Sequence, residues 1–213
     1  MRNAFAESVF KLAKKEKDLI LLAGDIGNRL FDNFKLKFKN RFYNCGVAEA
    51  NMTGIASGLA SAGLKPITYT ITPFNTLKCL EQIKLDICYP NLPVIIVGTG
   101  SGLSYSKLGS SHHSMEDISV LKSLPNIQII CPGDKIEVPL ALEHAYKSNK
   151  PTYIRLGKKG EPVVHNKIPK FRIGKGIKIS NGSDVSLISI GNMLPICLNA
   201  KKILENKKLS VEL

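Results

Sequence analysis

The sequence predicts an α/β fold: a doubly wound, mostly parallel sheet with helices on both faces. The first observation is that short apolar runs, such as Leu19–Ala23 and Pro93–Val97, alternate with stretches whose apolar residues recur at helical spacing. The second is composition, since hydrophobic residues make up 44% of a chain of 213 residues, enough to bury a core. At that length the chain holds one large domain, or one domain and part of another.

The alternation begins at the N-terminus. Phe5, Val9 and Ala13 share one helical face, so we expect a helix over residues 4–16. The apolar run Leu19–Ala23 predicts the first strand, which ends at a glycine and an aspartate. A short helix and a short strand follow, at residues 30–38 and 42–45.

Small apolar residues dominate positions 48–62, which predicts a closely packed helix with Gly63 at its C-cap. Further helices are expected at residues 75–88 and 134–148, the second with Asp134 as its N-cap. The remaining strands of this region are expected at residues 66–70, 92–97, 127–131 and 152–155.

The chain divides into three parts. We expect residues 1–157 to form the first domain and residues 158–182, rich in glycine, proline and lysine, to form a linker. Residues 183–213 resume the α/β pattern, with strands at 185–190 and 209–213 around a helix at 195–206. Since one such unit cannot bury both of its faces, this segment is expected to be only part of a second domain.

Composition excludes several classes of protein. The hydrophobic content excludes disorder, no apolar run is long enough to span a membrane, and lysines interrupt any signal peptide. The formal net charge of +13 comes from lysines spread along the chain, without the aromatic pattern of a nucleic-acid surface. Five widely spaced cysteines predict free thiols rather than a zinc site or disulfides. We therefore expect a cytoplasmic protein with no membrane or nucleic-acid partner.

Ligands of such sheets bind beyond the carboxyl ends of the strands, so the loops after residues 23, 45, 70, 98 and 155 are the candidates. In one of them Glu49 begins the small-residue helix. The residue pattern leaves two interpretations open: a helix N-terminal acid favoured by the helix dipole, or a catalytic carboxyl in an apolar pocket.

A second segment runs from Gly98 through His112, His113 and Asp117. Its glycines allow close approach to a ligand, but the segment contains neither the P-loop pattern nor the serine-hydrolase elbow. Two adjacent histidines without further ligands at metal-type spacing do not predict a metal site.

Four motifs occur in a telling order: GVAEANMTGIASGLA with Glu49, then Phe74, then GSSHHSMED, then TYIRLGKKG. This order resembles the pyrimidine-binding domain of thiamine-diphosphate enzymes. More specifically, it is similar to the C-terminal half of split transketolases, with 1-deoxyxylulose-5-phosphate synthase as a relative. The resemblance covers residues 1–157 and the opening of the domain that follows in the family.

The resemblance implies roles for residues at the cofactor. Glu49 matches the catalytic carboxyl that hydrogen-bonds the pyrimidine ring of thiamine diphosphate, and Phe74 matches the aromatic that stacks on that ring. Ile71 stands where the family often has a second aromatic, so a looser stack is expected. Asp25 is placed near the cofactor at a subunit interface.

The resemblance also implies roles at the substrate. His112 matches a histidine of the substrate channel that contacts sugar hydroxyls or moves protons. Arg155 matches an arginine that grips a sugar phosphate, although a structural ion pair is an equal alternative, and Lys158 stands where relatives have a second arginine. The implied enzyme is a two-carbon ketol transferase of carbohydrate metabolism.

The family holds the diphosphate through Mg²⁺ and a GDG motif followed by an asparagine, and this chain has no GDG. The magnesium site is therefore expected on an N-terminal partner subunit, in a homodimer or heterotetramer, and the chain alone is expected to be inactive. Three alternatives stay open: the β-type component of a 2-oxo-acid dehydrogenase, a non-catalytic assembly partner, and a basic binding module.

Overall fold

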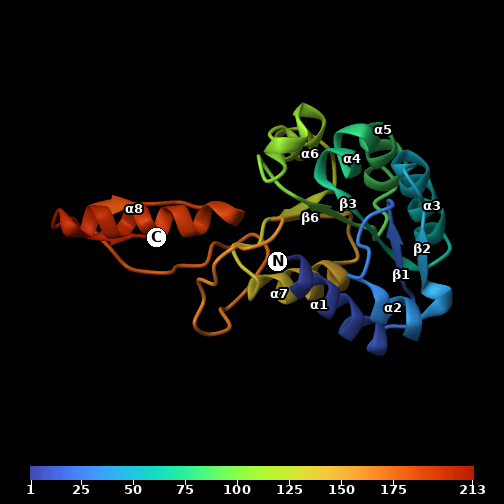
Figure 1. Ribbon diagram of the computed structural model, residues 1–213, viewed down its shortest axis with the longest axis horizontal. Coiled ribbons are helices and arrows are strands. Elements are labelled where there is room, and N and C mark those ends of the chain that lie inside the picture. The colour runs from blue at the N-terminus through green and yellow to red at the C-terminus, as the bar shows by residue number, and fades with distance from the viewer.

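The computed structural model describes residues 1–213 and contains a central sheet of six parallel strands (Figure 1). The strand order is β2-β1-β3-β4-β6-β5, and every pairing in this sheet is parallel. The strands are β1 (Leu19–Ala23), β2 (Phe42–Asn44), β3 (Lys65–Ile71), β4 (Ile95–Thr99), β5 (Gln128–Ile130) and β6 (Thr152–Leu156). The predicted fold class is confirmed.

Helices cover both faces of the sheet (Figure 1). One face carries α1 (Arg2–Lys15), α2 (Asp32–Lys37) and α7 (Glu137–Ser148); the other carries α3 (Glu49–Ser61), α4 (Thr72–Asn75), α5 (Leu80–Gln82) and α6 (Asp117–Lys122). Two apolar clusters, of 20 and 13 buried residues, fill the two layers. Within β1, Leu21 belongs to the first cluster and Leu22 to the second. Burial on both faces explains why the central strands are continuously apolar.

The prediction of one helix at residues 75–88 is wrong, because this segment consists of several short helical pieces. Pro73 starts α4 one turn earlier, because proline suits the first turn of a helix. Thr76 then leaves the helical region, with φ −129° and ψ −83°, and ends α4. A 3₁₀ turn at Leu77–Cys79, α5 and a π-helix at Ile83–Cys88 follow. This interruption places Phe74 and Lys78 beside α3.

Two other boundaries differ from expectation. The strand expected at residues 92–97 begins at Ile95 and runs on to Thr99. The proline at position 93 has no N–H group for the ladder. The helix expected from residue 134 begins at Glu137, yet Asp134 does cap it: its Oδ1 accepts hydrogen bonds from the backbone N–H groups of Ile136 and Glu137, at 2.8 and 3.2 Å.

The C-terminal segment extends away from the main body (Figure 1). It contains β7 (Val185–Ser186), α8 (Leu194–Asn206) and β8 (Val211–Glu212), with the two strands paired in parallel. Both strands are shorter than expected because each pairs only with the other, and Ile188 is 95% exposed. Residues 158–184 contain no helix or strand. None of the helices combines the length and the apolar character that crossing a membrane requires.

Candidate functional site

The sheet changes direction of winding between β1 and β3, since β2 lies on one side of β1 and β3 on the other. Ligands of doubly wound sheets bind at this switch point, beyond the carboxyl ends of the strands. Three loops meet there: Gly24 follows β1, Glu49 comes after β2, and Phe74 comes after β3. The topology therefore gathers the residues that the sequence assigned to the cofactor.

Glu49 is the first residue of α3 and is 2% exposed. It is both a helix N-terminal acid and a buried carboxyl, so the two interpretations of its sequence position apply together. Its Oε2 accepts a hydrogen bond from Lys78 Nζ at 2.5 Å, and its Oε1 accepts none. Gly24 packs against it: a Cβ at position 24 would lie 3.3 Å from Glu49 Cγ and 3.1 Å from Thr70. The absence of a side chain at Gly24 keeps this wall of the site close to the carboxylate.

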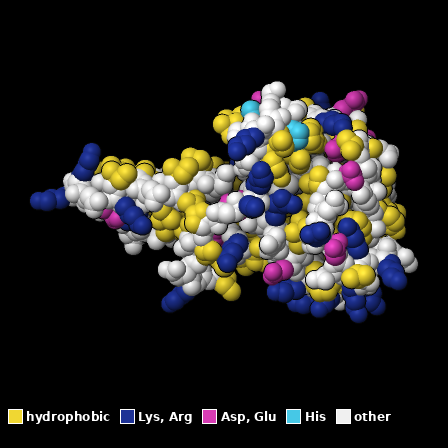
Figure 2. Space-filling model, in the orientation of Figure 1, with side chains coloured by type: hydrophobic (Ala, Val, Ile, Leu, Met, Phe, Trp, Pro, Cys, Tyr) yellow, Lys and Arg dark blue, Asp and Glu magenta, His cyan; other side chains and the backbone are white.

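Three aromatic rings continue the site. The rings of Phe74 and His112 meet edge to face, with centroids 5.1 Å apart, and Tyr105 lies 6.1 Å from His112. Lys78 Nζ is 6.0 Å from the centroid of Phe74, and Lys158 Nζ is 4.3 Å from that of Tyr105. A continuous row of side chains thus connects Glu49 to Lys158. Figure 2 shows lysine and arginine side chains gathered where the C-terminal segment meets the main body.

Arg155, at the end of β6, forms a buried ion pair. Its Nε donates to Asp117 Oδ2 at 2.7 Å, and its Nη2 donates to Asp117 Oδ1 at 3.3 Å. Burial by itself would lower the pKa of Arg155, but the hydrogen bonds and charge of Asp117 outweigh burial and raise the pKa. Of the two roles expected for Arg155, the structure contains the ion pair. The phosphate-binding role of Arg155 stays a prediction.

The same ion pair organises the loop that carries His112. Arg155 Nη2 also donates to the backbone carbonyl of Ser114 at 3.0 Å, and Ser114 exchanges two backbone hydrogen bonds with Gly102. Tyr153 donates its hydroxyl to Asp117 Oδ2 at 2.7 Å; burial, and then the Asp117 charge, raise the Tyr153 pKa well above its ordinary value. The Asp117–Arg155 pair therefore fixes one end of the loop near His112.

Asp25 lies at the edge of the site, is exposed and has a φ of 52°. Its Oδ1 accepts a hydrogen bond from Asn44 Nδ2 at 3.1 Å, and its backbone N–H donates to Asn44 Oδ1 at 3.2 Å. Asn44 Oδ1 also accepts the N–H of Gly46 at 2.9 Å, which shapes the turn before Glu49. Asp25 therefore joins the ends of β1 and β2 and forms no hydrogen bond with Glu49, so its cofactor role stays a prediction.

Sequence reasoning missed Lys78, Asn44 and Tyr105. Lys78 lies in the turn that follows α4, but its partner Glu49 is 29 residues away, and no local pattern signals such a contact. The signal for Asn44 was stronger, because asparagine at the end of a strand commonly shapes the following turn.

A cluster of two acidic residues and a histidine, Asp134, Glu137 and His165, lies at the start of α7. Asp134 accepts four backbone N–H groups, two at the start of α7 and two from Val164 and His165. Glu137 Oε1 is 2.6 Å from His165 Nε2. Burial by itself would raise the pKa of Asp134, but these four hydrogen bonds lower it. Because they occupy both Asp134 oxygens, the cluster acts as a clamp between α7 and residues 164–165.

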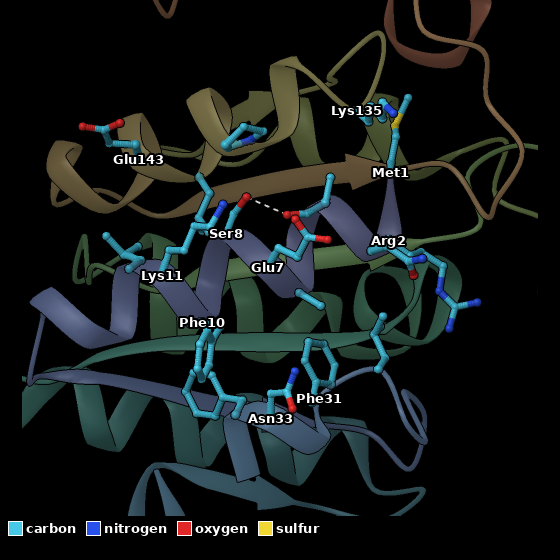
Figure 3. Close-up of a pocket in the computed structure, with 18 of the residues that line it drawn as sticks. Met1, Arg2, Glu7, Ser8, Phe10, Lys11, Phe31, Asn33, Lys135 and Glu143 are labelled. Atoms are coloured by element: carbon cyan, nitrogen blue, oxygen red, sulfur yellow. Dashed lines mark hydrogen bonds between the residues drawn. The ribbon is translucent and has the colours of Figure 1, made fainter. Parts of the chain in front are cut away.

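A wide groove runs along α1, between α7 on one side and the start of α2 on the other, and Arg2, Glu7, Phe10 and Lys11 line it (Figure 3). Of the predicted site residues, only Lys158 lines this groove. The groove is thus separate from the Glu49 carboxylate.

Comparison with known families places the chain. The model of the transketolase pyrimidine-binding domain matches residues 1–161. A putative transketolase C-terminal section from Methanocaldococcus jannaschii is 32% identical over 216 residues, which cover 100% of this chain and 68% of the relative. A subunit of the apulose-4-phosphate transketolase from Phocaeicola vulgatus is 30% identical, with 97% of this chain and 67% of the relative covered.

Solved structures agree. A split-gene transketolase, described as an inactive β4 tetramer, superposes with a TM-score of 0.90 at 32% identity, covering 99% of this chain and 69% of that one. Transketolase from Campylobacter jejuni shares the fold, with a TM-score of 0.88 at 18% identity, and this chain covers 34% of it. The chain thus spans about two thirds of relatives named as sections or subunits, and one third of a single-chain enzyme. It belongs to the transketolase family, in which it corresponds to the C-terminal subunit of split, transferase-type members.

Proposed function

We propose that this chain, with an N-terminal partner subunit, transfers a two-carbon ketol unit between sugar phosphates and uses thiamine diphosphate as cofactor. The observation that supports this most strongly is the buried Glu49 carboxylate at the switch point of the sheet, with one oxygen free of hydrogen bonds. The transketolase relatives favour this function over a 2-oxo-acid dehydrogenase component.

The residues present fit the pyrimidine ring of the cofactor. Oε1 of Glu49 is available to a ring nitrogen, Phe74 offers a half-buried aromatic surface, and Gly24 permits close approach. When bound, thiamine diphosphate supplies a nucleophilic carbon that carries the two-carbon unit. In this proposal Glu49 and a ring nitrogen share one proton in a hydrogen bond, Phe74 stacks on the ring, and Asp25 faces it across a subunit interface.

Substrate binding is proposed for the other end of the row. His112 contacts sugar hydroxyls or transfers a proton, as an imidazole can. Lys158 and the Nη1 end of Arg155 attract the phosphate, since the Asp117 ion pair uses only Nε and Nη2. A fixed guanidinium and a nearby ammonium suit a phosphate dianion.

The partner subunit completes the enzyme in this proposal. The chain lacks the GDG motif, so the N-terminal subunit would hold Mg²⁺ and the diphosphate. The related split-gene structure, described as an inactive β4 tetramer, supports the inactivity of this chain by itself. We further propose a cytoplasmic homodimer or heterotetramer, with residues 1–157, 158–182 and 183–213 as domain, linker and partial second domain.

Reconstitution tests this function. The chain, the N-terminal subunit and their mixture are each assayed for ketol transfer from a ketose phosphate to an aldose phosphate, with thiamine diphosphate and Mg²⁺. Only the mixture should be active, and pyruvate, a 2-oxo acid that has no ketol group, should not replace the ketose. Activity of this chain alone would contradict the divided site. A complex that forms but remains active with Glu49→Gln would support the non-catalytic assembly role instead.

A further inference from the structure

The contact between Lys78 and Glu49 lies at the site of the proposed function. Lys78 lies in the 3₁₀ turn Leu77–Cys79, and its Nζ is 2.5 Å from Oε2 of Glu49. The Glu49 side chain is 2% exposed, whereas the Lys78 side chain is 44% exposed. Lys78 therefore reaches from the surface into the site and is the only side chain that hydrogen-bonds this carboxylate.

The energetic meaning of this pair differs from that of a surface ion pair. A pair between exposed side chains contributes little to stability, because water solvates both charges. A buried carboxylate without its partner is strongly unfavourable, because it has lost its hydration and gained nothing in return. Glu49 thus depends on Lys78 far more than the exposed lysine depends on Glu49.

The pair also makes the two carboxylate oxygens of Glu49 different. Lys78 occupies Oε2, and Oε1 accepts no hydrogen bond. An ammonium on one oxygen restricts rotation of the carboxylate, so the other oxygen is held in place. Lys78 Nζ also lies 6.0 Å from the centroid of Phe74. The Lys78 ammonium therefore contacts the Glu49 carboxylate and lies near the Phe74 ring. In the proposed function, Glu49 and Phe74 bind the same pyrimidine ring.

We propose that Lys78 is a positioning residue, which fixes the Glu49 carboxylate so that Oε1 faces the pyrimidine ring of thiamine diphosphate. This inference rests on the proposed function. The lysine acts through Glu49 and is not itself a catalytic residue. Its place follows from the interruption of the helix at Thr76, which positions the 3₁₀ turn beside α3.

The first experiment titrates thiamine diphosphate, with Mg²⁺ present, into the complex with the N-terminal subunit and measures the dissociation constant by calorimetry. Lys78→Met keeps the length of the side chain and removes the charge, and it should weaken binding about tenfold, as expected for contacting, coupled residues. Lys78→Arg restores a cation and should stay close to wild type. Lys84→Met, an exposed lysine six residues on, is the matched control.

A double-mutant cycle separates action through Glu49 from an independent effect. In the Glu49→Gln background, Lys78→Met should weaken binding no further, because the group it positions is already lost. Additive losses would overturn the inference and assign Lys78 a direct contact with the cofactor. Equal affinities of the wild type and Lys78→Met would overturn it as well.

Thermal unfolding of this chain alone gives a readout that needs neither cofactor nor partner. Lys78→Met should lower the unfolding midpoint, and adding Glu49→Gln should recover it, because the uncompensated buried charge is then gone. An unchanged midpoint in Lys78→Met would show that Glu49 does not depend on the pair. If the wild-type complex fails to bind thiamine diphosphate while the unfolding cycle shows coupling, the proposed function fails and the ion pair stands.

Discussion

Two buried carboxylates at the carboxyl edge of the same sheet, Asp117 and Glu49, differ in the number of hydrogen bonds that they accept. Asp117 is 1% exposed and accepts three hydrogen bonds, one from Tyr153 and two from Arg155. Glu49 is 2% exposed and accepts one, from a lysine that is half in solvent. The difference separates a carboxylate that holds the fold together from one that retains capacity for a ligand.

The largest effect should come from the less satisfied carboxylate. Glu49→Gln in the reconstituted complex should lower ketol transfer about 10²- to 10⁴-fold, the range for removal of a group that handles protons. The circular dichroism spectrum should remain that of the wild type. Glu7→Gln, an exposed glutamate on α1, is the control and should keep full activity. If Glu49→Gln turned over at nearly the wild-type rate, Glu49 would lose its assigned role.

Asp117→Asn should have the opposite effect to Glu49→Gln, because it should act mainly on the stability of the fold. Removing one partner of a buried ion pair costs about 3–5 kcal/mol, because the Arg155 charge is left without its partner. Urea unfolding of the chain measures this loss. A loss below about 1 kcal/mol, the value typical of exposed pairs, would show that Asp117 is not the structural member of the comparison.

Asp134, at the start of α7, extends the comparison to a carboxylate that accepts four backbone N–H groups. Asp134→Asn should cost about 1.5–3 kcal/mol at neutral pH, the value for hydrogen bonds to a charged group. The folded state lowers the Asp134 pKa, so the unfolded state binds more protons and the contribution is present above the unfolded pKa of about 3.9. It disappears as pH falls through the lower folded value. The difference between wild type and variant in urea midpoints should therefore shrink below about pH 4; a constant difference down to about pH 2 would contradict the linkage.

The smallest effect is expected for an ion pair in solvent. Lys35 and Asp32 are 3.5 Å apart on α2, with side chains 37% and 54% exposed. Asp32→Asn should change the free energy of unfolding by less than about 1 kcal/mol, and added salt should reduce the effect further. If Asp32→Asn lowered the free energy of unfolding as much as Asp117→Asn does, burial would not explain why the two ion pairs differ in strength.

Much of this arrangement could be predicted from the sequence. Continuous apolar runs identified strands buried on both faces, and the loops after those strands contained Glu49, Phe74 and His112, which the topology brings into one row. The helix expected at residues 75–88 is too simple, because periodicity does not register that Pro73 starts a short helix and that Thr76 ends it. Lys78 and Asp117 depend on partners that are 29 and 38 residues distant, and local patterns do not record such contacts.

The clamp at Asp134 has a consequence for how the chain responds to a protease. Val164 and His165 are tied to the start of α7, and Lys158 is stacked on Tyr105, so the chain remains anchored for some ten residues beyond β6. Cleavage after residue 166 would leave the strands of the central sheet and the row from Glu49 to Lys158 on one fragment and α8 on the other. A limit digest of this protein should therefore retain one fragment that contains the whole row of side chains from Glu49 to Lys158.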